Sequence, residues 1–464
     1  TESGFNEGLE GSVIRTVIRT VEISPVSDGE KILRAGDTVL ISNDDAALSE
    51  AVKVSFTKAG LKAETRSLAQ IIEGQFPIDT KGLVIIAPAP EKALMNLWES
   101  SSEEWLKDAF MAIQKAGQAV KLNKGVIATV SRLDGRFGLD TMTKTTDPVQ
   151  GGLAGIAKTI RYEWSEVAAK AIDLDYRYKD EIEVADRLVA EVSAKSFMEV
   201  GLSKNSRIKI EEIESELSED NSCPANFRKS DVIIVTGGAR GVTAETAIAF
   251  AEKYKSTMVL IGRSPLPNEE PAWLRGLSDE GAIKKAILSN SGKQLSVKEL
   301  QAEYHSYMAN REVLNNLERI RSFGSDVFYY SADIRNESEI DQIVEKVRIE
   351  AGSITGLIHG AGVLRDRRIE DKTREQISDV LDTKVRGLRN ILKAISRDNL
   401  KVIVLFSSFS GRQGRLGQVD YAMANEVLNK AAQKLRILRR ECSVMAFNSG
   451  TWDGGMENSS LRKV

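Results

Sequence analysis

Cysteine and histidine are scarce in this sequence. Its 464 residues contain two cysteines, Cys223 and Cys442, and two histidines, His305 and His359. With so few ligands we expect neither a disulfide framework nor a His/Cys metal site. Two lone cysteines are typical of reduced thiols in a cytoplasmic protein. A Ser-His-Asp triad would have to use one of the two histidines, which narrows the chemistry that the chain can carry.

The sequence also lacks long apolar runs and an excess of one charge. Its net charge is −3 with both signs mixed throughout, which argues against nucleic acid as the main partner. No apolar run approaches the ~18 residues that a membrane-spanning helix needs. The first residues, TESGFNEGLEG, show neither the basic nor the apolar region of a signal peptide, and they lack a Met, so we expect a fragment of a longer chain. The composition predicts a soluble globular protein.

Short apolar runs rich in Val, Ile and Phe alternate with longer helical patterns. The runs are nearly continuous rather than alternating, which predicts a parallel sheet covered by helices on both faces. In the second half they lie at 231–238, 257–264, 326–334, 356–362, 402–408 and 443–450, and weaker ones in the first half lie at 37–44, 82–90, 125–133 and 169–175. We therefore predict an α/β protein with two units, residues 1–226 and 227–464, joined by a polar linker at 214–230.

The segment 265–307 interrupts this rhythm after the second run of the second half. It has helical periodicity and contains a Trp. Two interpretations stay open: a surface helical insertion that packs on its own domain, and a docking surface for another domain.

A glycine-rich turn follows the run at 231–238 and opens a helix. The stretch VTGGARGVTAETAIAF places Gly237, Gly238 and Gly241 where backbone can approach a pyrophosphate at a helix N-terminus. Thr243 stands where many dinucleotide loops have a third Gly. The first half has no such turn, because its first run is followed by NDDAALSEA, which sets acidic side chains where a phosphate would lie. We predict a dinucleotide site in the second half.

Arginines indicate which dinucleotide binds. The run at 257–264 ends with Arg263, where NAD sites usually carry an acid for the ribose 2′-OH, and Arg240 lies within the glycine turn. Two guanidinium groups favour a 2′-phosphate, which predicts NADPH. We expect Asp333 near the adenine and His359 as a hydrogen-bonded strand-end side chain. The predicted cofactor contacts are Thr236, Gly237, Gly238, Arg240, Gly241, Val242, Arg263, Ser264, Asp333, Ile334, Gly360, Ala361 and Gly362.

A tyrosine in the stretch GQVDYAMANEVLNK is the candidate acid. Reduction of a ketone builds charge on oxygen, which needs a proton donor and a second hydrogen-bond donor. Tyr421 and Ser408, thirteen residues earlier at the end of a predicted strand, can supply these. A phenol also needs a nearby cation to act near neutral pH. The residue four after Tyr421 is Asn425, and Lys430 lies on a different helix face.

These residues resemble the ketoreductase domains of polyketide synthases and polyunsaturated fatty acid synthases, a branch of the short-chain dehydrogenase/reductase superfamily. In that branch the lysine lies 37 residues before the Tyr in a K-V-x-G context, which here is Lys384 in LDTKVRGLRN. The resemblance implies that Lys384 supplies the charge, with Asn425 holding it or a water. It also implies two Rossmann-like subdomains, a structural one without a cofactor loop and a catalytic one. The segment 147–164 resembles the catalytic helix without its Tyr.

Other features of the resemblance bear on product and subfamily. GGARGVTAE, EEPAWL and RRIEDKT are most similar to the polyunsaturated fatty acid synthase branch. Asp366 matches the last Asp of the family's L-D-D fingerprint for the D (3R) alcohol, although Arg365 does not match. Gln413 stands where the opposite class has a Trp. Residues 450–464 correspond to a mobile segment that closes the pocket.

The resemblance therefore implies NADPH-dependent reduction of a 3-oxoacyl thioester, carried by an acyl carrier protein, to the 3-hydroxyacyl thioester. Other synthase domains would be partners, and no metal, nucleic acid or membrane is expected. Two alternatives stay open: a stand-alone NADPH carbonyl reductase, and a non-catalytic scaffold module. The intact set of Lys384, Ser408, Tyr421 and Asn425 argues against a scaffold for the whole chain, although a scaffold is our prediction for the N-terminal half.

Overall fold

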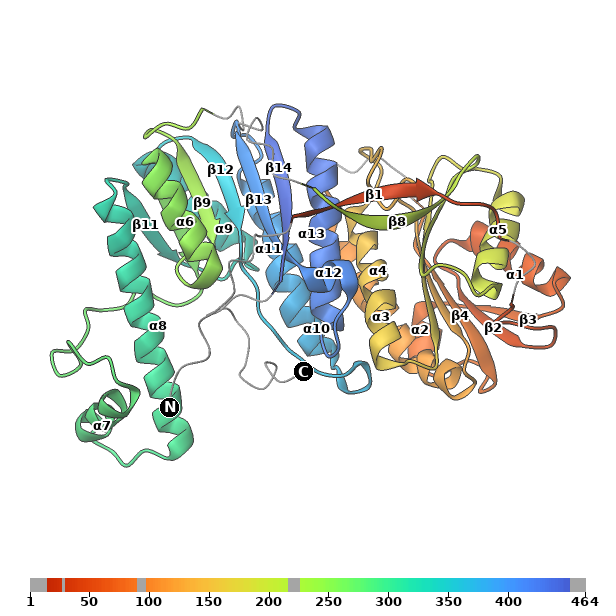
Figure 1. Ribbon diagram of the computed structural model, residues 1–464, viewed down its shortest axis with the longest axis horizontal. Coiled ribbons are helices and arrows are strands. Elements are labelled where there is room, and N and C mark those ends of the chain that lie inside the picture. Colours follow the sequence, from red (N-terminus) through yellow and green to blue (C-terminus); the bar gives the residue numbers. More distant parts are fainter. Residues whose placement is uncertain (1–14, 27–29, 90–96, 216–225, 451–464) are drawn as a thin grey trace, which may run out of the picture.

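Two sheets, each built from one half of the chain, form the frame of the molecule (Figure 1). The computed structural model describes residues 15–26, 30–89, 97–215 and 226–450. The predicted closing segment 450–464, apart from Gly450, and most of the predicted linker lie outside the described residues. The division at residues 226 and 227 stays a prediction.

The sheet of the second half has six parallel strands in the order β11-β10-β9-β12-β13-β14. This order reverses between β9 and β12, as in doubly wound dinucleotide-binding folds. Each strand matches a predicted apolar run, and β9 is buried along its whole length because helices cover both faces. The strands are β9 (Val232–Thr236), β10 (Thr257–Gly262), β11 (Val327–Ser331), β12 (Ile354–His359), β13 (Val402–Ser408) and β14 (Ser443–Ser449).

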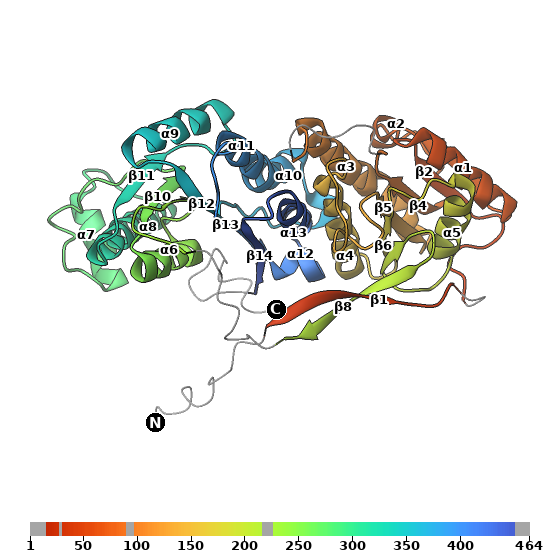
Figure 2. The ribbon, with the colours of Figure 1, turned by 90° about the horizontal axis from the view of Figure 1, so that it is seen from above.

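Helices pack on both faces of this sheet, as Figure 2 shows from above. One face packs against α6 (Gly241–Tyr254) and α8 (Val297–Ser322) through Ile233 and Val235. The opposite face packs against α9 (Glu337–Glu350), α13 (Val419–Leu438) and a long interrupted helix. That helix comprises α10 (Arg374–Leu381), a π-helical turn (Asp382–Arg386) and α11 (Gly387–Ala394). The short η2 (Ile369–Asp371) precedes it, and α12 (Phe409–Gln413) follows β13.

The sheet of the first half has eight strands in the order β1-β8-β7-β6-β5-β4-β2-β3. Four match predicted runs, and β1, β3, β7 and β8 were not predicted. The strands from β3 to β7 are parallel, whereas β8 runs antiparallel to β7 and β1. Its strands are β1 (Thr16–Glu22), β2 (Thr38–Ser42), β3 (Lys62–Arg66), β4 (Thr80–Ile86), β5 (Val126–Ser131), β6 (Ala168–Leu174), β7 (Glu199–Leu202) and β8 (Arg207–Glu214).

The turn after β2 in this half is occupied by the protein's own charges. Asp45 caps α1 by accepting a hydrogen bond from the Leu48 amide at 3.2 Å, and it forms a buried ion pair with Arg132. A carboxylate therefore lies at the helix start where a cofactor phosphate would bind. The helices of this half are α1 (Ala46–Lys58), α2 (Leu68–Ile72), α3 (Ser100–Leu122), η1 (Pro148–Gly151), α4 (Gly152–Glu163) and α5 (Glu181–Ser193).

One apolar core joins the two halves. It runs from Phe110 and Ile156 in the first half to Val427 and Leu388 in the second, and the helices α3, α4, α10, α11 and α13 lie between the two sheets in Figure 2. The helices α4 and α13 approach closely at Gly155, where a Cβ atom would lie 2.7 Å from the backbone of Ala422. The predicted counterpart of the catalytic helix thus packs directly against the helix that carries Tyr421.

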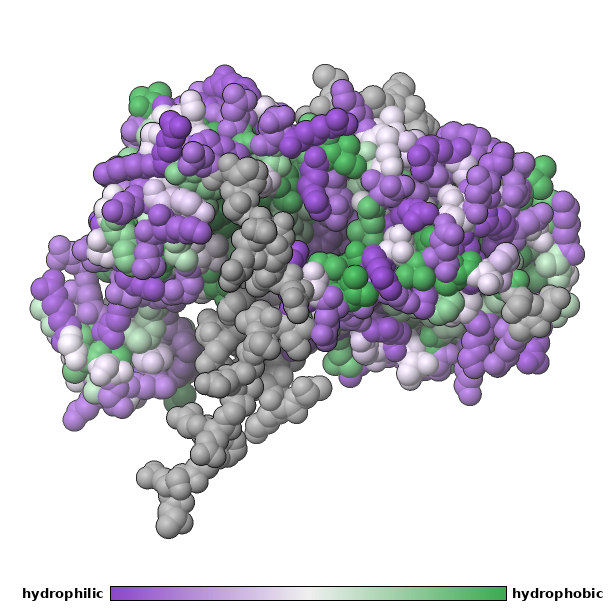
Figure 3. Space-filling model, turned by 45° about the horizontal axis from the view of Figure 1, so that its top comes forward, coloured by the Kyte–Doolittle hydropathy of each residue, from purple (hydrophilic) through white to green (hydrophobic). Residues whose placement is uncertain are grey.

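The predicted insertion contains α7 (Glu280–Asn290) and the first part of α8, which continues past residue 307 to Ser322. Figure 1 shows α8 extending beyond the sheet, with α7 beside its outer end. Leu274, Ile283 and Ile287 form a small core there. Hydrophilic side chains cover most of the described surface in Figure 3, with apolar ones in smaller groups. No helix among the described residues is long and apolar enough to cross a bilayer.

Candidate active site

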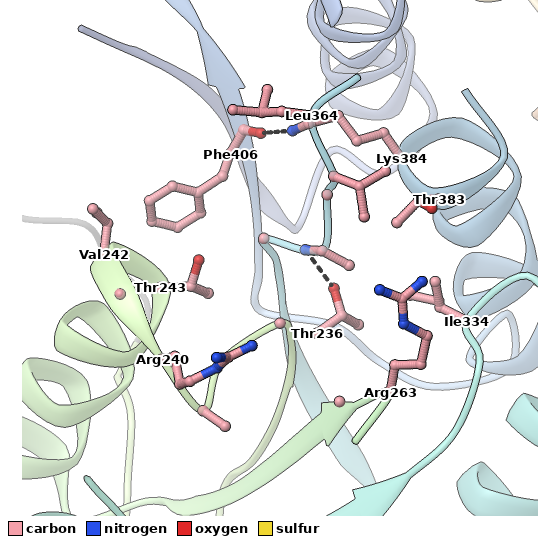
Figure 4. Close-up of a pocket in the computed structure, with 18 of the residues that line it drawn as sticks. Thr236, Arg240, Val242, Thr243, Arg263, Ile334, Leu364, Thr383, Lys384 and Phe406 are labelled. Atoms are coloured by element: carbon pink, nitrogen blue, oxygen red, sulfur yellow. Dashed lines mark hydrogen bonds between the residues drawn. The ribbon is translucent and has the colours of Figure 1, made fainter. Parts of the chain in front are cut away.

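A cleft of about 1240 Å³ lies beyond the carboxyl ends of the six parallel strands (Figure 4). This is the edge at which open α/β sheets bind ligands, next to the reversal between β9 and β12. Of the residues predicted from the sequence, fifteen line it: Thr236, Gly237, Arg240, Gly241, Val242, Arg263, Ser264, Asp333, Ile334, Gly360, Ala361, Gly362, Lys384, Ser408 and Tyr421. Gly238, Asp366, Gln413 and Asn425 are not among the lining residues.

The glycine turn joins β9 to α6 and forms one wall of the cleft. Thr243, which replaces a third glycine, lies in the first turn of α6 against Gly360 at the end of β12. A Cβ atom on Gly360 would lie 2.2 Å from the Thr243 Oγ1. The side chain of Thr243 therefore fits because the residue opposite it at the end of β12 is a glycine, Gly360, which has no side chain.

The two predicted arginines line the same part of the cleft. Arg240 comes from the glycine turn and Arg263 follows β10, and Figure 4 shows their side chains approaching one region from these two elements. Among the described residues, neither guanidinium group forms a hydrogen bond or an ion pair. Asp333 differs, because its carboxylate pairs with Arg335 at 2.6 Å, which lowers its pKa. Arg240 and Arg263 can thus accept an anionic ligand without breaking an existing pair.

Tyr421 and Ser408 face the cleft from adjacent elements. Tyr421 lies in the first turn of α13, and Ser408 ends β13 and caps α12, where its Oγ accepts the Ser410 amide at 3.1 Å. Burial raises the pKa of Tyr421, and the nearby polar side chain of Asn425 opposes this rise. Tyr421 is therefore protonated near neutral pH, as a proton donor must be.

Lys384 reaches the cleft from the π-helical turn between α10 and α11. Its Nζ donates a hydrogen bond to the Phe406 carbonyl at 2.9 Å and lies 5.1 Å from the centre of the Tyr421 ring. Burial lowers the pKa of Lys384 to about 7. The Lys384 ammonium beside the Tyr421 phenol therefore loses its proton near neutral pH.

His359 supports this turn from below and is hydrogen-bonded as predicted. Its Nε2 donates to the Lys384 carbonyl at 2.9 Å, because a carbonyl oxygen only accepts. Burial, together with the Lys384 charge, lowers the pKa of His359 to about 3, so the ring is neutral and Nδ1 accepts from the Thr236 hydroxyl at 2.9 Å. His359 therefore couples the cofactor strand β9 to the lysine turn.

The expectation for Asn425 is that it holds either Lys384 or a water, and the described contacts show no bond to Lys384. Its Nδ2 donates to the Tyr421 backbone carbonyl at 2.8 Å, one turn earlier in α13, and no hydrogen bond links it to Lys384 among the described residues. Its Oδ1 is buried without a protein partner there. A buried amide oxygen of this kind is a place for a bound water.

The two residues singled out for product stereochemistry lie apart from each other. Asp366 accepts hydrogen bonds from the Gln418 side chain at 3.2 and 3.3 Å, and Gln418 lines the cleft and accepts from Ser410. Gln413 instead points to the first half, where its side chain contacts Glu212 of β8 and Arg161 of α4. Asp366 is thus connected to the cleft through Gln418, whereas Gln413 belongs to the junction between the halves.

A buried ion pair that includes Asp420, the residue before Tyr421, was not predicted. Lys372 and Asp420 have side chains that are 0% and 1% exposed, and their charged atoms lie 2.9 Å apart. Lys372 also donates to the carbonyls of Arg365 at 2.6 Å and Gly417 at 3.2 Å, and so joins the segment before Asp366 to the segment before Tyr421. Burial raises the pKa of Asp420 to about 6. The motif RRIEDKT contains Lys372, but nothing in its pattern indicates a buried lysine.

The helix α8 also lines the cleft, which sequence reasoning missed. His305, Asn310 and Glu312 of α8 face it beside Arg240, and Tyr162 of α4 reaches it from the first half. The segment 265–307, for which a surface insertion and a docking surface were both left open, therefore contributes His305 to the wall of the predicted cofactor site.

Comparisons with known proteins identify similar chains. The family described as "KR domain" matches residues 232–454. One subunit of the polyunsaturated fatty acid synthase of Thraustochytrium sp. is 34% identical over 72% of this chain, and polyketide synthase PksN of Bacillus subtilis is 26% identical over 66% of it. The chain spans only 12% and 5% of these relatives.

Solved structures share the fold at low sequence identity. A ketoreductase domain from the bacillaene assembly line has a TM-score of 0.65 and 20% identity, covering 97% of this chain and 88% of that one. An A-type ketoreductase from a modular polyketide synthase has a TM-score of 0.70 and 18% identity, covering 97% and 86%. These likenesses confirm the predicted pair of Rossmann-like subdomains.

Proposed function

We propose that this chain is a ketoreductase that reduces a 3-oxoacyl thioester to the 3-hydroxyacyl thioester with NADPH, which the match of residues 232–454 to the family described as "KR domain" supports. The observation that carries the proposal is the convergence of Ser408, Tyr421 and Lys384 on one cleft with the glycine turn. A ketone oxygen placed between the Ser408 and Tyr421 hydroxyls would receive two hydrogen bonds as its negative charge develops.

Each side chain has a separate role in the transfer of the proton. Tyr421 gives its phenolic proton to the carbonyl oxygen, and Ser408 holds that oxygen by a hydrogen bond. The positive charge on Lys384 stabilises the phenolate that Tyr421 becomes, and the Phe406 carbonyl keeps the ammonium in place. A water at Asn425 Oδ1 would provide the path by which the phenol regains a proton.

The cleft suits NADPH for two reasons. The glycine turn and Gly360 leave backbone rather than side chains at its wall, and Arg240 and Arg263 are free to bind a 2′-phosphate. NADPH, when bound, supplies the hydride that reduces the carbonyl carbon. Asp333, already paired with Arg335, would lie near the adenine end.

Arg263→Ala is expected to weaken NADPH binding about 10- to 100-fold, since a hydrogen bond to a charged group contributes about 1.5–3 kcal/mol. NADH binding should change little, because NADH has no 2′-phosphate. Calorimetric titration of both cofactors against wild type and variant measures this. An equal loss for NADPH and NADH would show that Arg263 does not recognise the 2′-phosphate.

The rate of reduction should fall as pH rises through the pKa of Lys384. Below about 7 the ammonium is charged and stabilises the Tyr421 phenolate, and above it the charge is lost. We expect kcat/KM, which reports on the free enzyme, to decrease from pH 6 to pH 9. Lys384→Arg keeps its charge over this range and should move the decrease to higher pH. A flat wild-type profile would contradict the assignment of the charge to Lys384.

We further infer that the substrate arrives on the phosphopantetheine arm of an acyl carrier protein and that other synthase domains accompany the chain in the cytoplasm. The relatives are synthases of which this chain spans only a small part, which supports this inference. We propose the D (3R) alcohol as product because Asp366 matches the last Asp of the family's L-D-D fingerprint, and Asp366 is hydrogen-bonded to Gln418, which lines the cleft. The decisive experiment follows NADPH consumption with an acetoacetyl-pantetheine thioester and determines the chirality of the product. NADPH binding without any turnover would indicate a missing closing segment or carrier protein, whereas no NADPH binding at all would favour a scaffold role.

A further inference from the structure

The helix α8 contacts the glycine turn and the first part of α6 at three points. Its Asn316 Nδ2 donates to the Ala239 carbonyl within the turn at 3.1 Å, and Arg319 pairs with Glu245 of α6 at 2.6 and 2.9 Å. Between these contacts and the open cleft, the Glu312 Oε1 accepts a hydrogen bond from the Gly241 amide at 2.8 Å. Gly241 is the first residue of α6. A carboxylate from α8 thus binds an amide at the start of the helix that faces the predicted cofactor site.

The backbone that carries Glu312 is held in place on both sides. Arg311 donates to the Glu270 side chain at 2.7 Å and to the carbonyls of Leu277 and Leu274 at 2.8 and 3.2 Å. Val313 is buried against the α6 face of the sheet. Glu312 lines the cleft, and its hydrogen bond to the Gly241 amide lies at the exposed surface. The Glu312 side chain can therefore move, but the fixed backbone keeps its carboxylate close to the start of α6.

This position gives Glu312 an electrostatic effect on any dinucleotide. The first amides of α6 carry the partial positive charge that favours a pyrophosphate, and a carboxylate already hydrogen-bonded there neutralises part of it. A dinucleotide entering the cleft must displace this carboxylate or lie beside it, and two anions close together repel. The contacts from Asn316 and Arg319, by contrast, support the turn without adding negative charge to it.

We propose that Glu312 is an internal competitor for the phosphate-binding start of α6 and sets a lower affinity for NADPH than the turn would otherwise have. The proposal rests on the proposed function in naming NADPH as the ligand. Because the oxidised and reduced cofactors carry the same phosphates, Glu312 weakens the binding of both and favours release of the oxidised product. The insertion 265–307 thereby acts on the cofactor site through the helix that it extends.

Glu312→Gln separates charge from hydrogen bonding, since the amide oxygen still accepts from Gly241. Calorimetric titration with NADPH at low ionic strength should give an affinity about three- to tenfold tighter than wild type, as expected for removing one partly exposed like charge. Salt should reduce the gain, because it screens exposed charges. The matched control is Glu318→Gln on the same helix, whose side chain is 75% exposed and does not line the cleft. This control should bind NADPH as wild type does.

Three outcomes are distinguishable in this titration. Tighter binding by Glu312→Gln alone, with unchanged thermal unfolding, supports the inference. Unchanged or weaker binding by Glu312→Gln would overturn it, since Glu312 would then either be indifferent to the cofactor or hold the turn in its binding form. A wild-type chain and variants that all fail to bind NADPH would overturn the proposed function and the inference together.

Discussion

Tyr421→Phe is expected to reduce kcat by about 10²- to 10⁴-fold, the usual contribution of a positioned general acid. The substitution removes one oxygen atom from a side chain in the first turn of α13 and leaves the ring beside Lys384. The glycine turn, Arg240 and Arg263 are untouched, so NADPH should bind as it does to wild type. Initial-rate assays with the acetoacetyl thioester measure kcat, and calorimetric titration measures cofactor affinity.

Tyr330→Phe provides a matched control for this substitution. The Tyr330 hydroxyl donates to Glu350 at 2.6 Å, outside the cleft, and its loss should leave kcat within about twofold of wild type, as for most substitutions away from the site. Full activity in Tyr421→Phe would remove Tyr421 from the mechanism. A loss of NADPH binding equal to the loss of rate would instead indicate that the phenol supports the cleft rather than the reaction.

Lys372→Met should destabilise the protein by about 3–5 kcal/mol, the cost of leaving a buried charge without its partner. Lys372 and Asp420 are almost completely buried, and methionine offers no donor to Asp420 or to the carbonyls of Arg365 and Gly417. The free energy of unfolding from urea denaturation at pH 7.5 measures this loss. A change below about 1 kcal/mol would mean that the pair contributes little to the folded state.

The pH dependence of the Lys372→Met defect gives an independent check. Burial raises the pKa of Asp420 to about 6 even with Lys372 present, so the folded variant holds a proton there more tightly than the unfolded chain does. Stability of the variant should therefore fall as pH rises through the pKa of the folded state, and the loss at pH 7.5 should exceed the loss at pH 5. Lys393→Met, which removes a half-exposed ion pair with Glu337, should cost less than about 1 kcal/mol at both pH values.

The sequence predicts the strands that form continuous apolar runs, which are all six strands of the second sheet and four of the first. Central strands such as β9 are apolar throughout because helices cover both faces, whereas the edge strands β11 and β14 are apolar although only partly buried. The four strands that were not predicted lack this signal. β3 reads KAETR at a sheet edge, and β8 reads RIKIEEIE and is only partly buried after its first two residues. β7 is only four residues long, and β1 forms the other edge.

Only the site residues with a local sequence signal could be predicted from the sequence. Ser408 and Tyr421 can be inferred because the reaction needs two hydroxyl donors and because both residues lie at the end of a predicted strand or the start of a predicted helix. Lys384 can be inferred only from the resemblance, since it lies 37 residues before Tyr421 and this spacing alone does not place the two side chains in one cleft. The π-helical turn that carries it has no sequence signature that separates it from the flanking helix. The roles of Glu312 and Lys372 depend on where α8 and the segment after β12 pack, which is decided by contacts remote in sequence.

The single core that runs through both halves limits how this unit can be recombined with others. The two halves bury their apolar side chains against each other in this core. At Gly155 the backbones of α4 and α13 lie so close that an added methyl group would clash with Ala422. A chimera that takes its first half from one parent and its second half from another must match this core side chain by side chain. Exchange of this unit between related proteins should therefore succeed when crossovers fall outside both halves, so that the two halves are inherited together.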